Sequence, residues 1–333
     1  MKTTFVMLLV VGAFLLPGAV STLTAQADKV TVIRFASLAP AGSAFMKVLK
    51  AWSRSLKKET EGRAELRYYS GGSQGDERDF IRKIRAGQMD AAGVSTVGLG
   101  MVVRPVLVLS APGVITEYPQ LTRTREALND RFAKMFDEAG FVLIAWGDAG
   151  KNRIMAVDKF AKPSDLKTMR PWAWKDDPIF AEYIKVIGAN PVRLGVPEVY
   201  PGLQTRMVDV VPSSAIGAVA LQWYTRLKYM ANQNFSIIIG GSIVKKEKFN
   251  ELSPEDQKVL VDTGHRAARA LDKLVRRDDG RAYNSMQKRG VSVVDIKPHE
   301  AEWNAVAKKT RNNLIGRVYS KSLLKAVENA ANK

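Results

Sequence analysis

The sequence has no cysteine and only two histidines in 333 residues. Disulfides are therefore excluded, and neither a thiolate nor a cluster of imidazoles can bind a metal. The phosphate-binding P-loop and the dinucleotide-binding glycine pattern are both missing, and Gly93–Gly98 lacks the spacing of a hydrolase nucleophile elbow. We therefore expect a protein that is not an enzyme and needs no cofactor.

Adjacent acids at Asp176 and Asp177 keep one enzymatic alternative open. Two carboxylates can serve as acid and base in an exported hydrolase of the glycosidase type. Acids that are neighbours in sequence are more often solvated residues at a loop or a helix end, so the hydrolase remains a secondary hypothesis.

Long apolar runs are also scarce. One such run covers residues 5–16 behind Lys2, and Ala25-Gln26-Ala27 fits the small-x-small rule for signal cleavage. The run is shorter than the roughly 20 residues that cross a bilayer, and no later run reaches that length. We interpret residues 1–27 as a signal peptide cleaved near Ala27, which predicts a periplasmic mature protein.

The charge is strongly unbalanced, with 51 Lys and Arg against 33 Asp and Glu and a net charge of +18. Such an excess can attract nucleic acid, anionic membranes or acidic ligands. The cations are scattered along predicted helices, without a basic arm or an aromatic nucleic-acid motif. We expect a solvated basic surface and no nucleic-acid partner, and keep an interaction module for anionic lipid or polymer as an alternative.

The order of the predicted elements favours an α/β fold with two lobes, a hinge and a cleft between them. A strand at Thr31–Phe35, a Gly/Ser/Pro loop, a helix and a strand at Ala64–Tyr69 are typical of a parallel sheet. The same succession starts again after Gly147. We predict lobe I over residues 28–147 with a return over about 236–280, and lobe II over residues 148–235 together with 281–333.

Four further segments complete the prediction. Val102–Ile115 is apolar and punctuated by prolines, and we expect loop and strand there. A strand is expected at Met169–Trp174 and a helix at Ala215–Met230. Ser253 and Pro254 have the features of a helix start, and that helix should run to about Gln287, long enough to span both lobes.

The predicted strand Met169–Trp174 carries the first candidates for ligand binding. Arg170, Trp172 and Trp174 are two residues apart, so they project from one face of that strand. Two tryptophans on one face can simply be core residues. The flanking Pro, Lys and Asp, and the need of each indole N–H for a partner, favour the wall of a pocket instead.

Further candidates lie at or near the ends of predicted strands or in the helix that follows. Ligands of parallel α/β proteins bind at the carboxyl ends of strands, although helix capping and packing are alternative roles for such residues. These candidates are Ser95, Thr96, Ser213, Gln222 and Trp223.

Eight fragments, in their order and spacing between about Val32 and Ile296, resemble the solute-binding proteins of TRAP transporters, the DctP-like family. The resemblance implies an exported, two-lobed binding protein with a long helix across both lobes. It also implies delivery of a small organic ligand to a membrane permease, without chemistry, and a monomer is expected. The fragments are Glu59–Arg63, Gly71–Asp76, Arg85–Asp90, Gly140–Trp146, Pro163–Lys167, Leu203–Asp209, Leu221–Trp223 and Leu252–Gln257.

One departure from the family pattern concerns the ligand. Members that take carboxylates usually have an arginine at the position of Trp172, whereas Arg170 falls at a family lysine and Arg153 matches a second family cation. An indole in that place removes a bidentate partner for a carboxylate. We therefore expect an apolar or amphipathic ligand against Trp172 and Trp174. The alternative is an ordinary organic-acid binder in which Arg153 and Arg170 replace the missing arginine.

Overall fold

The computed structural model describes residues 30–333, and the predicted signal peptide lies outside them. The strands are β1 (Thr31–Ser37), β2 (Ala64–Tyr69), β3 (Ala91–Ser95), β4 (Phe141–Ala156), β5 (Trp172–Trp174), β6 (Val192–Leu194), β7 (Val210–Ser213), β8 (Tyr229–Ala231), β9 (Ser236–Lys245) and β10 (Ser292–Val294).

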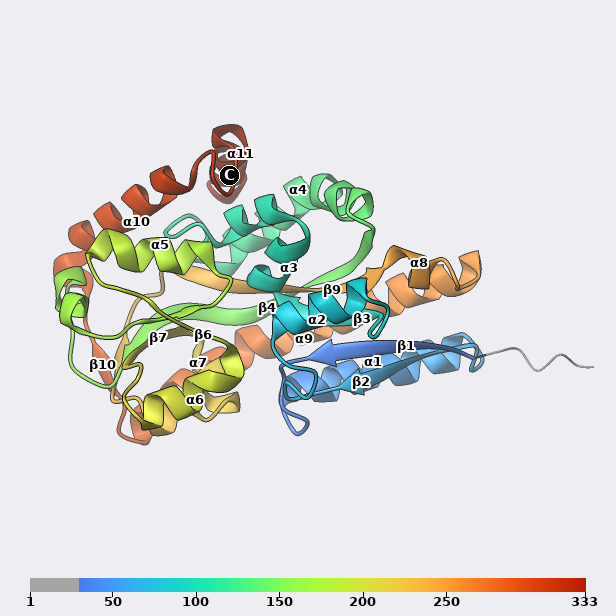
Figure 1. Cartoon of the computed structure of the whole chain (residues 1–333), viewed down its shortest axis with the longest axis horizontal. Coiled ribbons are helices and arrows are strands. Elements are labelled where there is room, and N and C mark those ends of the chain that lie inside the picture. Colours follow the sequence, from blue (N-terminus) through green and yellow to red (C-terminus); the bar gives the residue numbers. More distant parts are fainter. Residues whose placement is uncertain (1–29) are drawn as a thin grey trace, which may run out of the picture.

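Helices cover both faces of the sheet (Figure 1). The α-helices are α1 (Ala44–Glu59), α2 (Glu77–Arg85), α3 (Thr96–Val102), α4 (Tyr118–Glu138), α5 (Pro178–Ile187), α6 (Val196–Gln204), α7 (Ala215–Ala220), α8 (Lys246–Phe249), α9 (Pro254–Lys288), α10 (Glu300–Leu314) and α11 (Lys321–Ala331). Short 3-10 helices include η1 (Arg104–Ser110) and η3 (Trp223–Thr225). No helix within residues 30–333 is long and apolar enough to cross a bilayer.

Two long strands connect the lobes. The main sheet has the order β10-β8-β4-β9-β3-β1-β2, with β7 also paired to β4, while β5 and β6 form a separate parallel pair. β4 pairs with β9 over most of its length and with β7 and β8 at its carboxyl end. The sheet therefore continues from the β1–β3 lobe into the lobe that holds β7, β8 and β10, and the predicted two-lobed α/β fold is confirmed.

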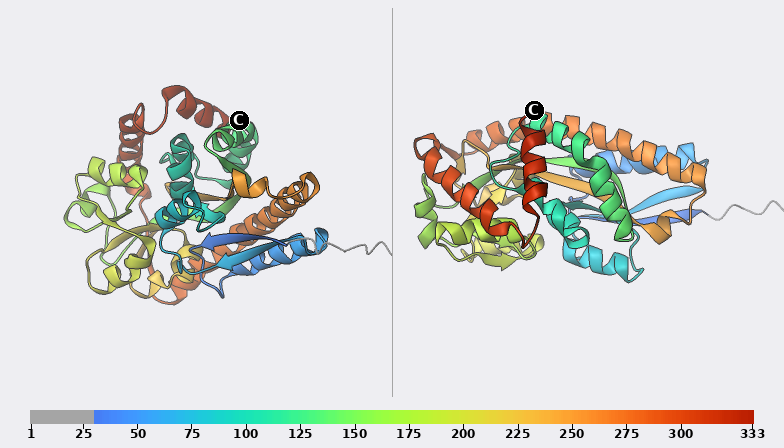
Figure 2. Two further views of the ribbon diagram at one scale, coloured as in Figure 1. Left: turned by 45° about the vertical axis from the view of Figure 1, so that its right-hand side comes forward. Right: turned by 90° about the horizontal axis from the view of Figure 1, so that it is seen from above.

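Helix α9 spans the molecule (Figures 1 and 2). Its 35 residues correspond to roughly 50 Å, and it packs against α1 in the first lobe and α7 in the second. Ser253 caps its first turn, and the helix continues without a break through Gly280. The lobe boundaries predicted from the sequence remain a prediction, because residue 147 falls inside β4 and residue 280 inside α9.

Three local predictions are wrong. Val102–Ile115 forms the end of α3 and then η1 instead of a strand. A fully buried helix and a fully buried strand both have a continuous apolar sequence, so periodicity cannot distinguish them. The predicted helix Ala215–Met230 stops at Ala220, because Gln222 adopts a left-handed conformation with φ +60°. Of the strand predicted at Met169–Trp174, only the last three residues form a strand, β5.

Candidate functional site

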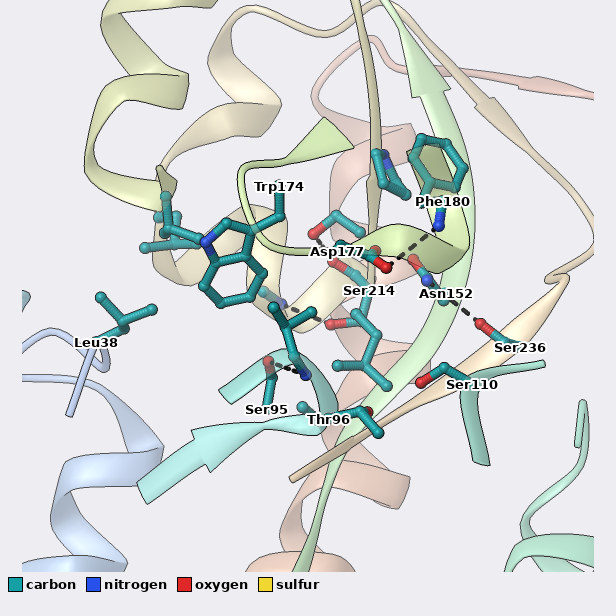
Figure 3. Close-up of a pocket in the computed structure, with 18 of the residues that line it drawn as sticks. Leu38, Ser95, Thr96, Ser110, Asn152, Trp174, Asp177, Phe180, Ser214 and Ser236 are labelled. Carbon is teal, nitrogen blue, oxygen red and sulfur yellow. Dashed lines mark hydrogen bonds between the residues drawn. The ribbon is translucent and has the colours of Figure 1, made fainter. Parts of the chain in front are cut away.

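A cavity of about 260 Å³ lies where the two lobes meet (Figure 3). One wall comes from the loop after β1 and from the junction of β3 and α3. The facing wall comes from β5, α5 and the junction of β7 and α7, while β4 and β9 pass along both. A cleft between two lobes is a common place for a small-molecule site, so we take this cavity as the candidate ligand site.

Aromatic side chains form much of the second-lobe wall. Trp172 and Trp174 project from one face of β5, as their spacing predicts, with ring centroids 6.2 Å apart. Trp223 packs edge-on against Trp172 at 5.4 Å, and Phe180 and Phe235 stack at 5.6 Å. Flat rings from three elements thus present a large apolar surface to the cavity.

The two β5 tryptophans are held differently. Trp172 is 4% exposed, and its indole N–H donates to the carbonyl of Leu194 at 3.0 Å. Trp174 is half-buried, and its N–H donates to Asp76 Oδ2 in the other lobe at 2.7 Å. Both indoles therefore have the polar partners that buried tryptophans require, and the half-buried Trp174 offers more of its ring to the cavity than Trp172 does.

The predicted hydroxyl residues Ser95, Thr96 and Ser213 also line the cavity. Thr96 donates to the carbonyl of Ile239 at 2.9 Å, and Ser213 donates to the carbonyl of Ser214 at 3.0 Å. Ser95 caps α3 and is hydrogen-bonded to the buried Glu77. Because Thr96 and Ser213 already use their hydrogens, they offer a ligand lone pairs rather than donors.

Arg153, Arg170 and Gln222 do not line this cavity. Arg153 lies 3.4 Å from Asp279 on α9 and stacks on the ring of Tyr283. Arg170 precedes β5 and pairs with Asp209 at 3.1 Å. Gln222 is exposed in the turn after α7. Both candidate guanidinium groups thus have carboxylate partners within the protein.

The sequence analysis missed Asn152, which lines the cavity from β4. Its amide nitrogen donates to Ser236 Oγ at 3.3 Å, while its buried amide oxygen has no partner among the described residues. A buried acceptor without a partner is costly, so a ligand donor would satisfy it. Strand alternation could have identified this residue, because Lys151 and Arg153 share one face of β4 and Asn152 lies on the opposite face.

Asp177 is the one charged residue among the described residues that line the cavity. It caps α5 by accepting from the amides of Ile179 and Phe180, and burial raises the pKa of its carboxyl. Asp176 lies 3.3 Å from Arg78 instead. The adjacent acids considered for a hydrolase are therefore a helix cap and a member of an ion pair.

Comparison with known families decides the class of protein. Residues 35–315 match the family described as bacterial extracellular solute-binding protein, family 7, known as DctP. The chain belongs to this family. Its members are binding proteins of TRAP transporters, as the resemblance in the sequence indicates, and the family is periplasmic.

Curated relatives cover most of this DctP-family chain at low identity. A solute-binding protein of Chromohalobacter salexigens is 25% identical over 77% of this chain and 75% of its own length. The 2,3-diketo-L-gulonate-binding periplasmic protein YiaO of Escherichia coli is 24% identical over 84% of this chain and 86% of its own.

Solved structures agree in fold. A TRAP periplasmic solute-binding protein of Chromohalobacter salexigens with bound D-glucuronate has a TM-score of 0.84 and 20% identity, covering 90% of this chain and 99% of that one. A TRAP periplasmic solute-binding protein of Ralstonia eutropha with bound (S)-2-acetolactate has a TM-score of 0.85 and 21% identity, covering 91% of this chain and 99% of that one. At these identities the similarity shows the shared fold alone.

Proposed function

We propose that this protein is the periplasmic solute-binding component of a TRAP-type transporter and that it captures an uncharged amphipathic ligand in the cleft. The observation that carries the proposal is the lining of the interlobe cavity. Aromatic and aliphatic side chains dominate it, and no lysine or arginine is present among its described residues.

The polar groups of the cavity favour a ligand that donates hydrogen bonds. Asn152 offers an amide oxygen, the hydroxyls of Thr96 and Ser213 offer lone pairs, and Asp177 is acidic. A carboxylate is held most strongly by cations, and no lysine or arginine is present among the described residues of this wall. Hydroxyl groups on an apolar body would suit both the acceptors and the tryptophans.

Identification of the co-purifying ligand tests this function. Protein exported to a bacterial periplasm would be examined by native mass spectrometry, then extracted with solvent and the extract identified. We expect an uncharged amphipathic molecule that is lost from Trp174→Ala. As a matched control, Trp303→Ala alters a tryptophan of the second lobe that does not line this cavity, and it should retain the molecule. A cleft that co-purifies only with organic acids would overturn the proposal.

The alternative of an ordinary organic-acid binder has support from the relatives, since a similar structure holds D-glucuronate. Calorimetry with D-glucuronate separates the two functions. We expect no binding, because Arg153 and Arg170 are paired with Asp279 and Asp209. Binding that disappears in Arg153→Ala but persists in Trp174→Ala would establish the organic-acid function instead.

A membrane permease completes the proposed transporter. The family implies that the closed, ligand-bound lobes dock on that permease and release the ligand there. Export to the periplasm would depend on the signal peptide predicted at residues 1–27, which is testable by N-terminal sequencing of the mature protein.

A further inference from the structure

A second cavity of about 200 Å³ adjoins the interlobe cavity on the first-lobe side. It lies between the sheet and the two helices α1 and α9. Five residues line both cavities, so the two spaces are neighbours with a common boundary. These residues are Leu38, Ala39, Phe45, Ser95 and Ala149.

The strands show that the two cavities form one tract. Along β4 the second cavity is lined by residues 145–149 and the first by Ala149 and Asn152. Along β9 the second cavity takes residues 240–242 and the first takes 236–238, and β3 shows the same succession through Ser95. The eight residues of β4 from 145 to 152 span roughly 23 Å.

Small residues line much of the second cavity, and among its glycines Gly147 leaves the most room. α9 contributes Gly264, Ala267 and Ala268 to it, and the strands contribute Gly93, Gly147 and Gly241 among others. Apolar side chains form most of the remaining lining, including Val48, Leu49 and Leu271, which keep partial exposure although their helices pack on the sheet. Glu77 and Asp148 also line it, but their carboxylates are bonded within the protein, to Ser95 and Arg276. Protein interiors are normally close-packed, so an apolar space of this size adjoining a ligand cleft is suited to part of the ligand.

We propose that this second cavity is a binding compartment for the unbranched alkyl chain of the ligand, whose uncharged polar end lies near Asn152 in the cleft. The inference rests on the proposed function and extends it by defining the ligand as a long, single-chain amphiphile. The polar end meets the unpaired amide oxygen, and the chain passes Phe45 and Leu38 into the space between α1, α9 and the sheet.

A series of primary alcohols, from butanol to hexadecanol, tests the compartment by calorimetry on the full mature chain. Each methylene that becomes buried should raise the affinity about fourfold. The wild-type affinity should therefore rise with chain length well beyond the alcohols that fill the cleft.

Ala268→Leu reduces the second cavity from the helix side. It should leave the affinity for short alcohols unchanged and lower the affinity for the longest by at least tenfold. Ala270→Leu is the matched control, because Ala270 is exposed on the same helix and lines neither cavity. Gly147→Ala repeats the test from the sheet side, since its added Cβ would meet only Leu271, at 3.5 Å.

The outcomes separate the compartment from the function of the cleft. If Ala268→Leu and Gly147→Ala bind long alcohols as tightly as Ala270→Leu does, the compartment is wrong, although the amphiphile function stands. If the wild-type protein binds no alcohol of any length, both are overturned. Thermal unfolding of each variant, compared with wild type, shows that a loss of binding reflects the cavity and not the fold.

Discussion

At the scale of single residues, Trp172 and Trp174 combine core packing with a cavity wall. Trp172 packs in a buried cluster with Trp223 and Met155 and is almost inaccessible, whereas Trp174 is half-buried and bonded to Asp76 across the cleft. The same strand face therefore carries one side chain that mainly stabilises the second lobe and one that contacts the other lobe and is the proposed ligand contact.

Substitution should separate these two roles. Trp172→Ala removes a large buried ring and is expected to lower the free energy of unfolding by about 3–5 kcal/mol. Trp174→Phe keeps one aromatic ring but loses the second ring of the half-buried indole and the bond to Asp76, and the lost bond costs about 1 kcal/mol. Urea unfolding measures both, and equal midpoints for the two variants would contradict the assignment.

The sequence could place the tryptophans on one face but could not place the arginines. The alternation of β5 follows from local geometry, so Trp172 and Trp174 were predicted correctly as neighbours. The carboxylate partners of Arg153 and Arg170 are Asp279 and Asp209, which lie 126 and 39 residues further along the chain. Such long-range pairing depends on the assembled fold, and no local pattern of the sequence indicates it.

At the scale of elements, the start of α2 in the first lobe contacts the second lobe through Asp76. Its Oδ2 accepts from Trp174 Nε1 at 2.7 Å and from the amide of Val196, the first residue of α6, at 3.3 Å. Beside it, Arg78 of α2 lies 3.3 Å from Asp176. These contacts bridge the cleft next to the ligand cavity, so they would stabilise the closed arrangement of the lobes.

Removal of Asp76 should favour opening. Asp76→Ala is expected to increase the radius of gyration of the ligand-free protein in small-angle X-ray scattering, because it deletes both bonds across the cleft. Asp79→Ala is the control, since Asp79 completes the capping box of α2 without a contact to the second lobe in the described structure. Each variant should cost about 1 kcal/mol of stability through the lost cap. An equal radius for both variants would refute the interlobe role.

Element boundaries show where sequence reasoning reaches its limit. The helix at 254–288 was predicted almost to its ends, because Ser253, Pro254 and the acids of its first turn are local signals. The end of α7 was missed, since Gln222 adopts a left-handed conformation that is uncommon for glutamine and that no glycine marks in the sequence. The second cavity was also missed, as it is lined by residues of three strands and two helices that come together only in the folded protein.

At the scale of the whole molecule, one ionic cluster ties α9 to β4 where the sheet passes between the lobes. Asp148 of β4 is fully buried and lies 2.7 Å from both Arg125 of α4 and Arg276 of α9. Asp272 of α9 accepts from the amide of Asp148 at 2.7 Å. Four charges from three elements therefore meet at the region about which the lobes would move.

This cluster predicts a pH dependence of stability. Burial, together with the nearby charge of Asp148, raises the pKa of Asp272 to about 6. The folded state thus retains a proton that the unfolded state releases near pH 3.9. The contribution of Asp272 to the free energy of unfolding is therefore complete at low pH and is lost as the pH rises toward about 6. Asp272→Asn should remove this pH dependence, which changes the free energy of unfolding by at most about 1.4 kcal/mol per pH unit.

Urea unfolding between about pH 4 and 6 measures the effect, since this window lies between the ordinary aspartate pKa and the raised one. The wild-type stability should fall more steeply with rising pH than that of Asp272→Asn. Asp278→Asn serves as control on the same helix, because hydrogen bonding to Arg277 lowers the pKa of Asp278 and places its titration below the window. If the three proteins share one slope, the proton is not held at Asp272.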